Sequence, residues 1–170
     1  PKIYAGILNI RKNKSHINDL KKNNFEKIDL VIVNFYPFEK TVQNTINHNK
    51  IIKNIDIGGP TLVRAAAKNY NDVTVITNPE QYEELIKELN SNKSGTTLKF
   101  RQKMSEIAFT ETAYYDGLVS NYFNSKSKII FPEKKIFFGG LIENLRYGEN
   151  PHQNAAIYSV NNKLNINQLH

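Results

Sequence analysis

The alternation of apolar and polar residues predicts short strands separated by helices. Residues 28–34 are a run rich in β-branched residues, which is typical of a strand buried on both faces of a sheet, and residues 72–77 predict a second strand. Pro37 follows the first run closely and prevents further strand pairing there. Because strands and helices alternate along the chain, we expect an α/β fold with a mainly parallel sheet flanked by helices.

The helices are predicted from spacing and from capping residues. Residues 9–27 suit a surface loop with a short helix, and residues 41–54 are expected to be helical or irregular. Asn78 is a suitable cap and Pro79 a suitable first helical residue, so a helix is expected over residues 80–89.

A longer helix is expected to begin after Thr96 or Thr97 and to end near Phe123. Its apolar residues recur at helical spacing, which is more typical of a buried core than of a ligand site. The members of this core stripe are Met104, Ile107, Ala108, Tyr114, Tyr115, Leu118 and Tyr122.

Residues 55–69, IDIGGPTLVRAAAKN, predict a turn that leads directly into a helix. Gly58 and Gly59 allow unusual backbone angles and the close approach of a ligand. Pro60 suits the first helical turn, where its missing N–H is not needed. The alanine-rich sequence that follows favours the helix.

One face of this helix is expected to carry Thr61, Arg64 and Lys68. Arg64 and Lys68 are like charges one turn apart, which disfavours a helix by about 0.2–0.5 kcal/mol unless an anion lies nearby. That anion is either Asp56, one turn back, or an anionic substrate at the helix N-terminus. The alternative is that both cations simply extend into water.

Composition excludes several classes of protein. The 170 residues include no cysteine, so the chain has no disulfide framework, which suits the cytoplasm. No apolar run is long enough to span a membrane. The net charge of +7 is spread among asparagine and isoleucine residues, which fits solvated faces and phosphorylated substrates better than nucleic acid. The four histidines lie far apart and predict no metal site.

Five stretches, in order, resemble the bifunctional AICAR transformylase/IMP cyclohydrolase family of purine biosynthesis. They are PKIYAGIL at residues 1–8, NFYPF at 34–38, IDIGGPTLVRAAAKN at 55–69, AFTETAYYD at 108–116 and LRYGENPHQ at 145–153. The resemblance implies a methylglyoxal-synthase-like fold. It also implies a cyclohydrolase domain over residues 1–135 and the beginning of a transformylase domain over residues 136–170, joined by a polar connector at 125–135.

The chain also departs from the family pattern. The family's N-terminal strand, its Ser/Gly/Thr-rich phosphate loop and an active-site lysine precede the position of Pro1 and are missing here. Tyr4 and Ala5 replace a more usual His-Gly. The expectation is therefore a fragment with weak or no activity.

The resemblance implies ring closure of formyl-AICAR to IMP with loss of water, a step that needs no cofactor. A poorly nucleophilic amide must be held against the formyl carbon, and the developing oxyanion needs a donor. The family's positions map onto Lys68 as general acid or oxyanion stabiliser, Asp56 as its partner and possible proton acceptor, and Tyr36 as an orienting hydrogen-bond donor. The expected substrate-binding residues are Asn34, Gly58, Gly59, Thr61 and Arg64. Arg64 in an ion pair with Asp56, and Asn34 as a turn-forming residue, remain alternatives.

The LRYGENPHQ string resembles the start of the transformylase domain, where Arg146, Tyr147 and His152 would contact the AICAR nucleotide. For the full-length protein the resemblance implies 10-formyltetrahydrofolate as co-substrate and a homodimer. The alternative is a non-catalytic nucleotide-binding or regulatory module of the same fold. A nucleic-acid-binding domain ranks last because the positive charge is diffuse.

Overall fold

The computed structural model describes residues 1–127 and 130–160, and the chain divides into two compact units, Pro1–Ala113 and Tyr114–His170. The domain boundary predicted at residue 135 falls inside the second unit and remains a prediction. Part of the expected connector, residues 128–129, and the end of the expected second domain, residues 161–170, lie outside the described residues.

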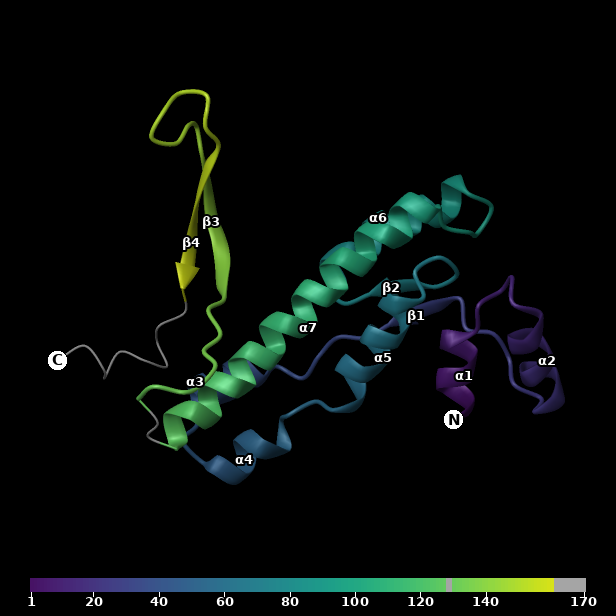
Figure 1. Cartoon of the computed structure of the whole chain (residues 1–170), viewed down its shortest axis with the longest axis horizontal. Helices are drawn as coiled ribbons and strands as arrows, with labels where there is room; N and C mark the ends of the chain where they lie inside the picture. Colours follow the sequence, from purple (N-terminus) through teal and green to yellow (C-terminus); the bar gives the residue numbers. More distant parts are fainter. Residues whose placement is uncertain (128–129, 161–170) are drawn as a thin grey trace. The chain divides into compact units, whose positions relative to one another are not determined.

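The first unit is built around two parallel strands, with helices before, between and after them (Figure 1). Its elements are α1 (Lys2–Leu8), α2 (Lys14–Lys22), β1 (Leu30–Ile32), α3 (Phe38–Asn44), α4 (His48–Lys53), α5 (Gly58–Lys68), β2 (Thr74–Ile76), the 3₁₀ turn η1 (Pro79–Gln81) and α6 (Tyr82–Ser91). A last helix, α7 (Leu98–Lys126), carries residues of both units.

The two strands confirm the predicted parallel α/β arrangement. Val31 pairs with Val75, and the crossover between the strands runs through α3, α4 and α5. Both strands therefore end at the same edge of the sheet, the carboxyl edge, and α5 returns the chain to the opposite, amino edge.

The prediction that the first strand, β1, is buried on both faces is wrong. All three residues of β2 are buried, whereas β1 buries Val31 and leaves Leu30 37% and Ile32 46% exposed. Val31 belongs to a core cluster with Val63, Ala66 and Ala67 of α5. The opposite side of β1, to which Leu30 and Ile32 point, has no comparable cover among the described residues.

The predicted caps are present. The Asn78 side chain accepts from the N–H of Glu80, and the Gln81 side chain accepts from the N–H of Asn78, forming a capping box. Thr97 caps α7, because its hydroxyl accepts from the N–H of Phe100 at 3.2 Å. In α7 the side chains of Met104, Ala108, Tyr115, Leu118 and Tyr122 are buried, which confirms most of the predicted core stripe.

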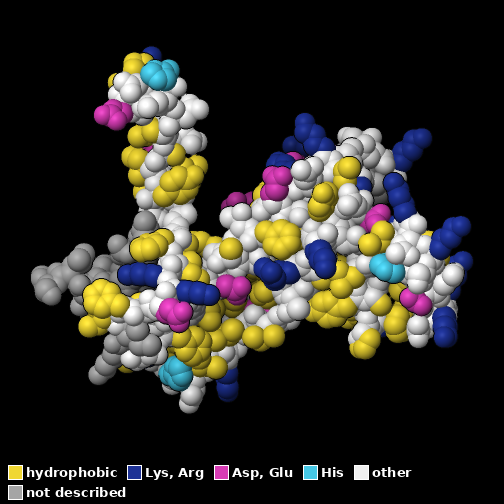
Figure 2. All heavy atoms as spheres, in the orientation of Figure 1, with side chains coloured by type: hydrophobic (Ala, Val, Ile, Leu, Met, Phe, Trp, Pro, Cys, Tyr) yellow, Lys and Arg dark blue, Asp and Glu magenta, His cyan; other side chains and the backbone are white. Residues whose placement is uncertain are grey.

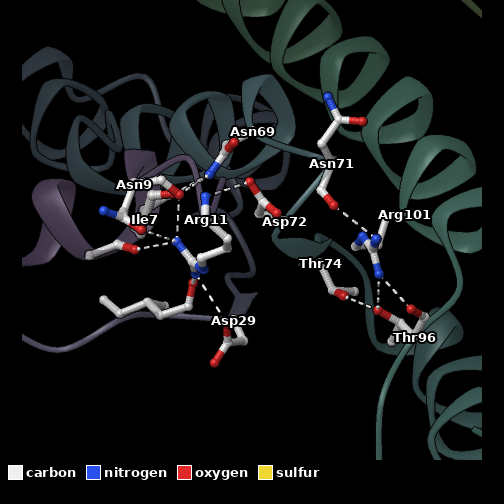
Figure 3. A network of polar contacts seen from close by, with 12 residues as sticks. Ile7, Asn9, Arg11, Asp29, Asn69, Asn71, Asp72, Thr74, Thr96 and Arg101 are labelled. Atoms are coloured by element: carbon white, nitrogen blue, oxygen red, sulfur yellow. Dashed lines mark hydrogen bonds and ion pairs between the residues drawn. The ribbon is translucent and has the colours of Figure 1, made fainter. Parts of the chain in front are cut away.

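Two arginines tie loops to this framework (Figure 3). Arg11 donates to the carbonyl oxygens of Asn9 and Ile28 and pairs with Asp29 at 3.1 Å. Arg101 donates to the carbonyl oxygens of Tyr70 and Asn71, each at 2.8 Å, and to the Thr96 carbonyl. Bonds to a charged guanidinium are among the stronger ones in proteins, so these clamps fix the amino edge.

The second unit contains an antiparallel hairpin of β3 (Gly139–Leu145) and β4 (Ala155–Val160). The loop between these strands is closed by the N–H of Gly148, which donates to the Gln153 carbonyl at 2.7 Å. Among the residues described in either unit, no helix has the length and hydropathy needed to cross a membrane.

Candidate functional site at the carboxyl edge

Three loops meet where the parallel strands end, and they bring together several of the predicted site residues. The first loop follows β1 and carries Asn34 and Tyr36, the second precedes α5 and carries Asp56, and the third follows β2 and leads to Tyr82. The backbone N–H of Tyr36 donates to Asp56, and the Asn34 amide donates to the Tyr82 hydroxyl at 3.1 Å. Open α/β sheets place their binding sites at this edge.

The Asp56 carboxylate is the central group of this cluster. Its Oδ1 accepts from the backbone N–H of Gly59 at 2.8 Å, and its Oδ2 accepts from the N–H of Tyr36 at 3.3 Å. A carboxylate at this position satisfies a free N–H in the first turn of α5 and lies favourably in the helix dipole. The half-buried Asp56 side chain therefore joins the β1 loop to the start of α5.

The two glycines of the turn do not have the unusual backbone angles that the sequence suggested. Neither adopts a positive φ. Close approach is instead the reason for a glycine at Gly59, because a Cβ there would lie 2.5 Å from Oδ2 of Asp56. A Cβ on Gly58 would meet no atom within 4 Å, so the neighbouring glycine borders open space.

The remaining predicted residues at this edge present polar groups to solvent. The Tyr36 side chain is 57% exposed, and Thr61 is exposed with its hydroxyl donating to the Ile57 carbonyl. Asn34 is held by the Tyr82 hydroxyl rather than by its own turn. Tyr82 was missed by sequence reasoning, although its place just after the second strand puts it at the same edge.

Arg64 is not in an ion pair with Asp56. Its guanidinium lies over the ring of Phe109, 5.6 Å from the ring centroid, and it forms no ion pair with any residue that the structure describes. A cation–π contact of this kind contributes about 0.5–1 kcal/mol at an exposed position. Arg64, which has the like charge of Lys68 one turn away, thus has the Phe109 ring as its partner instead of an anion.

Lys68 is the predicted residue that the fold separates from the others. It is the last residue of α5 and is exposed, without a hydrogen bond or ion pair to the residues described. At a rise of about 1.5 Å per residue, the nine steps from Gly59 to Lys68 span about 14 Å. A lysine side chain extends about 6 Å. Within one chain, Lys68 therefore cannot touch the same atoms as Asp56.

The three residues predicted for the transformylase nucleotide site lie together in the loop of the hairpin in the second unit. Arg146, Tyr147 and His152 are all exposed, and their side chains form no hydrogen bonds within the described part of the chain. The strand pairing of β3 with β4 places the two ends of this loop side by side. Their proposed role remains a prediction.

A cavity of about 790 Å³ lies at the other, amino edge of the sheet, and sequence reasoning did not predict it. Its lining includes Asp29, Leu30, Asp72, Ile86 and Arg101. The charged groups there already have partners: Arg11 holds both aspartates, and Arg101 is held by backbone carbonyls. These groups fix loops, so the carboxyl edge is the better candidate for chemistry.

The surface and the titratable groups also limit the possible chemistry. On the face shown in Figure 2, the Lys and Arg side chains are scattered rather than gathered into one basic patch. Among residues 1–127 and 130–160, no three His, Asp or Glu side chains form a cluster that could hold a metal ion. The groups at the carboxyl edge are thus a carboxylate, a phenol, an amide and backbone N–H groups.

Comparison with known proteins identifies the family to which this chain belongs. Residues 2–61 match the MGS-like domain family, which agrees with the methylglyoxal-synthase-like fold. Residues 66–170 match the family described as AICARFT/IMPCHase bienzyme. Because the second match covers more than half of the chain, the chain belongs to the AICARFT/IMPCHase bienzyme family.

Its relatives carry the name bifunctional purine biosynthesis protein PurH. The chain is 47% identical over 163 residues to the protein of Bradyrhizobium diazoefficiens, covering 96% of this chain and 31% of that protein. It is 44% identical over 159 residues to the protein of Thermoanaerobacter sp. (strain X514), covering 93% and 31%. The chain thus spans about a third of the length of these relatives.

Among solved structures, that of ForH is similar to this chain. It matches with a TM-score of 0.63 at 26% sequence identity, covering 72% of this chain and 63% of that chain. The likeness supports the fold described above.

Proposed function

We propose that this chain carries the IMP cyclohydrolase site of a longer bifunctional enzyme of purine biosynthesis, which closes formyl-AICAR to IMP with loss of water. The observation that carries the proposal is the cluster at the carboxyl edge, where the Asp56 carboxylate is held by the backbone N–H groups of Gly59 and Tyr36, and the Tyr36 side chain is exposed. Membership of the family supports the choice of reaction.

The reaction forms a bond between the substrate carboxamide nitrogen and the formyl carbon. The carboxamide nitrogen loses one proton as this bond forms, and the formyl oxygen becomes an oxyanion. The formamido nitrogen loses a second proton as its bond to the same carbon becomes double and the C–O bond breaks, and the oxygen takes up two protons and leaves as water. Holding the two reacting atoms together supplies much of the rate, because the step becomes one within a fixed geometry. The enzyme must therefore orient the amide, help two protons to move from nitrogen to the departing oxygen, and stabilise the oxyanion.

The residues at the carboxyl edge meet these needs. Asp56 has a fixed carboxylate that can accept a hydrogen bond or a proton from the substrate amide. The exposed Tyr36 hydroxyl and the Asn34 amide provide orienting hydrogen bonds. The N–H of Gly58 in the first turn of α5 has no acceptor among the described residues, so it is available to donate to a substrate oxygen. For Lys68, which lies at the far end of α5, the role of general acid or oxyanion stabiliser rests on the family resemblance alone.

In the longer protein, Arg146, Tyr147 and His152 bind the nucleotide of AICAR for formyl transfer from 10-formyltetrahydrofolate. Their exposure in one hairpin loop leaves their side chains available to a ligand. The cyclohydrolase step then uses the product of this transfer.

The assignment at the carboxyl edge is tested in a full-length chimera, in which this chain replaces the matching segment of the Bradyrhizobium relative. Tyr36→Phe is expected to lower kcat for ring closure by about 10²-fold, because one positioned donor is lost. Tyr70→Phe is the matched control, since Tyr70 lies beyond the far end of α5. Equal rates for the two variants would remove Tyr36 from the mechanism.

Asp56→Asn keeps the size of the side chain and removes its charge. Ring closure by this variant is expected to fall by about 10² or more, with the fold retained. Asp19→Asn on the exposed face of α2 controls for the loss of one negative charge. An unchanged rate for Asp56→Asn would show that the carboxylate takes no part in the reaction.

A further inference from the structure

Tyr82 reaches the carboxyl edge, but the mechanism proposed above does not use it. It is the first residue of α6, and its half-buried ring packs against the core cluster that contains Val31 and Ile76. Its hydroxyl oxygen accepts a hydrogen bond from the Asn34 side-chain amide at 3.1 Å. A tyrosine combines an apolar ring with a polar tip, so the core fixes the ring and the hydroxyl meets the loop after β1.

Backbone pairing that continues past β1 brings Asn34 and Tyr82 together. The N–H of Val33 donates to the carbonyl oxygen of Ile76 at 3.0 Å, one residue beyond the end of β1. Asn34 is the residue that follows this bond. On the other side, the capping box holds the turn from which Tyr82 enters α6. Both side chains therefore extend from backbone that the sheet or the cap holds in place.

The bond between these side chains is better suited to orienting an amide than to stabilising the fold. Asn34 is exposed, and within residues 1–127 and 130–160 its side chain has Tyr82 as its hydrogen-bond partner. Water replaces such a bond in the unfolded chain, so its net contribution to stability is small. The bond nevertheless commits one amide N–H to Tyr82 and leaves the carbonyl oxygen of Asn34, Oδ1, available to accept from a ligand.

We propose that Tyr82 is a positioning residue for ring closure, which acts by holding the Asn34 amide in the orientation that receives the substrate carboxamide. This inference rests on the proposed function, in which Asn34 orients that group. With one N–H of Asn34 committed to Tyr82, Oδ1 accepts a hydrogen bond from the carboxamide N–H. The nucleophilic nitrogen is thereby held against the formyl carbon, and an amide free to rotate would hold it less well.

The first test is Tyr82→Phe in the full-length chimera, which removes the hydroxyl and keeps the ring in the core. The kcat for ring closure of formyl-AICAR is expected to fall by about 10-fold, because the orientation of the amide is lost. The KM is expected to change by less than about 3-fold, because the hydroxyl contacts Asn34 and not the substrate. Tyr70→Phe is the matched control, since Tyr70 is also half-buried but lies beyond the far end of α5, and it should keep the wild-type kcat.

A double-mutant cycle tests whether Tyr82 acts through Asn34. Asn34→Ala is expected to lower kcat by about 10-fold or more, because the orienting group itself is removed. Adding Tyr82→Phe to Asn34→Ala should then change kcat by less than about 2-fold, because the hydroxyl has no amide left to hold. If the two substitutions instead multiply their effects, Tyr82 does not act through Asn34 and the inference is overturned.

The inference and the proposed function fail in different ways. If Tyr82→Phe keeps the wild-type kcat while Asp56→Asn loses activity, the inference is overturned and the carboxyl-edge site stands. If Tyr82→Phe lowers Tm but the folded enzyme keeps the wild-type kcat, the bond is structural, which also overturns the inference. If the folded wild-type chimera closes no ring, the proposed function is wrong and the inference falls with it.

Discussion

The contact between Gly59 and Asp56 makes a sharp prediction for two neighbouring glycines. In Gly59→Ala the new Cβ would lie 2.5 Å from Oδ2, 2.9 Å from Cγ and 3.0 Å from Oδ1 of Asp56. A Cβ atom essentially never lies so close to another heavy atom, so the carboxylate must move away. Because Gly59 is buried and its N–H bonds Oδ1, this movement breaks the bond at the start of α5.

The expected size follows from three contributions. A lost hydrogen bond to a charged group costs about 1.5–3 kcal/mol. Displacing a packed side chain adds about 1–3 kcal/mol. Alanine in place of glycine in a helix returns about 1 kcal/mol. We therefore expect Gly59→Ala to lower the free energy of unfolding by about 1.5–5 kcal/mol, or Tm by roughly 3–20 °C at about 2–4 °C per kcal/mol.

Gly58→Ala is the matched control, because it makes the same chemical change one residue earlier. Its Cβ would meet no atom within 4 Å, and its φ is not positive. We expect this variant to be as stable as the wild type, or more stable by up to about 1 kcal/mol. Urea unfolding of the three proteins, followed by circular dichroism, measures the difference. Equal stability of the two alanine variants would refute the steric role of Asp56.

Two further substitutions test contacts that hold the framework. Hydrogen bonds from Thr97 lower the pKa of Glu88 from its ordinary value of 4.5. The ionised Glu88 therefore stabilises the fold above pH 4.5, and this stabilisation is lost as the pH falls through the lowered pKa. Glu88→Gln should therefore reduce Tm at pH 7, with the gap from wild type closing under acid; a gap independent of pH between 7 and 2 would contradict this. Arg101→Met removes the donor to the carbonyl oxygens of Tyr70 and Asn71, so we expect the free energy of unfolding in urea to fall by about 2–4 kcal/mol. Arg64→Met loses only the contact with the Phe109 ring, so the expected fall is at most about 1 kcal/mol. Similar losses for the two arginine variants would show that the Arg101 clamp does not stabilise the fold.

Local signals in the sequence were sufficient where neighbours in the chain determine the structure. Asn78 and Thr97 form the predicted caps, and Pro60 lies in the first turn of α5 as expected. A cap depends on residues three or four positions apart, so its partners are visible in the sequence. The order of strands and helices likewise indicated the parallel sheet.

Contacts between distant segments could not be predicted in this way. The bond from Asn34 to Tyr82 joins residues 48 positions apart. The exposure of Leu30 and Ile32 depends on which elements cover β1, and strand periodicity carries no such information. A sequence motif also does not show where its residues lie in space. Asp56 and Lys68 belong to the same motif, but α5 separates them, so they lie at opposite edges of the sheet.

The measurement that tests the central claim most directly is the conversion of formyl-AICAR to IMP by the full-length chimera, followed by chromatography of the nucleotides. The account predicts turnover that depends on Asp56 and Tyr36, together with binding of IMP. A folded chimera that binds the nucleotide but never closes the ring would contradict the account. The carboxyl edge would then be the binding site of a non-catalytic regulatory module.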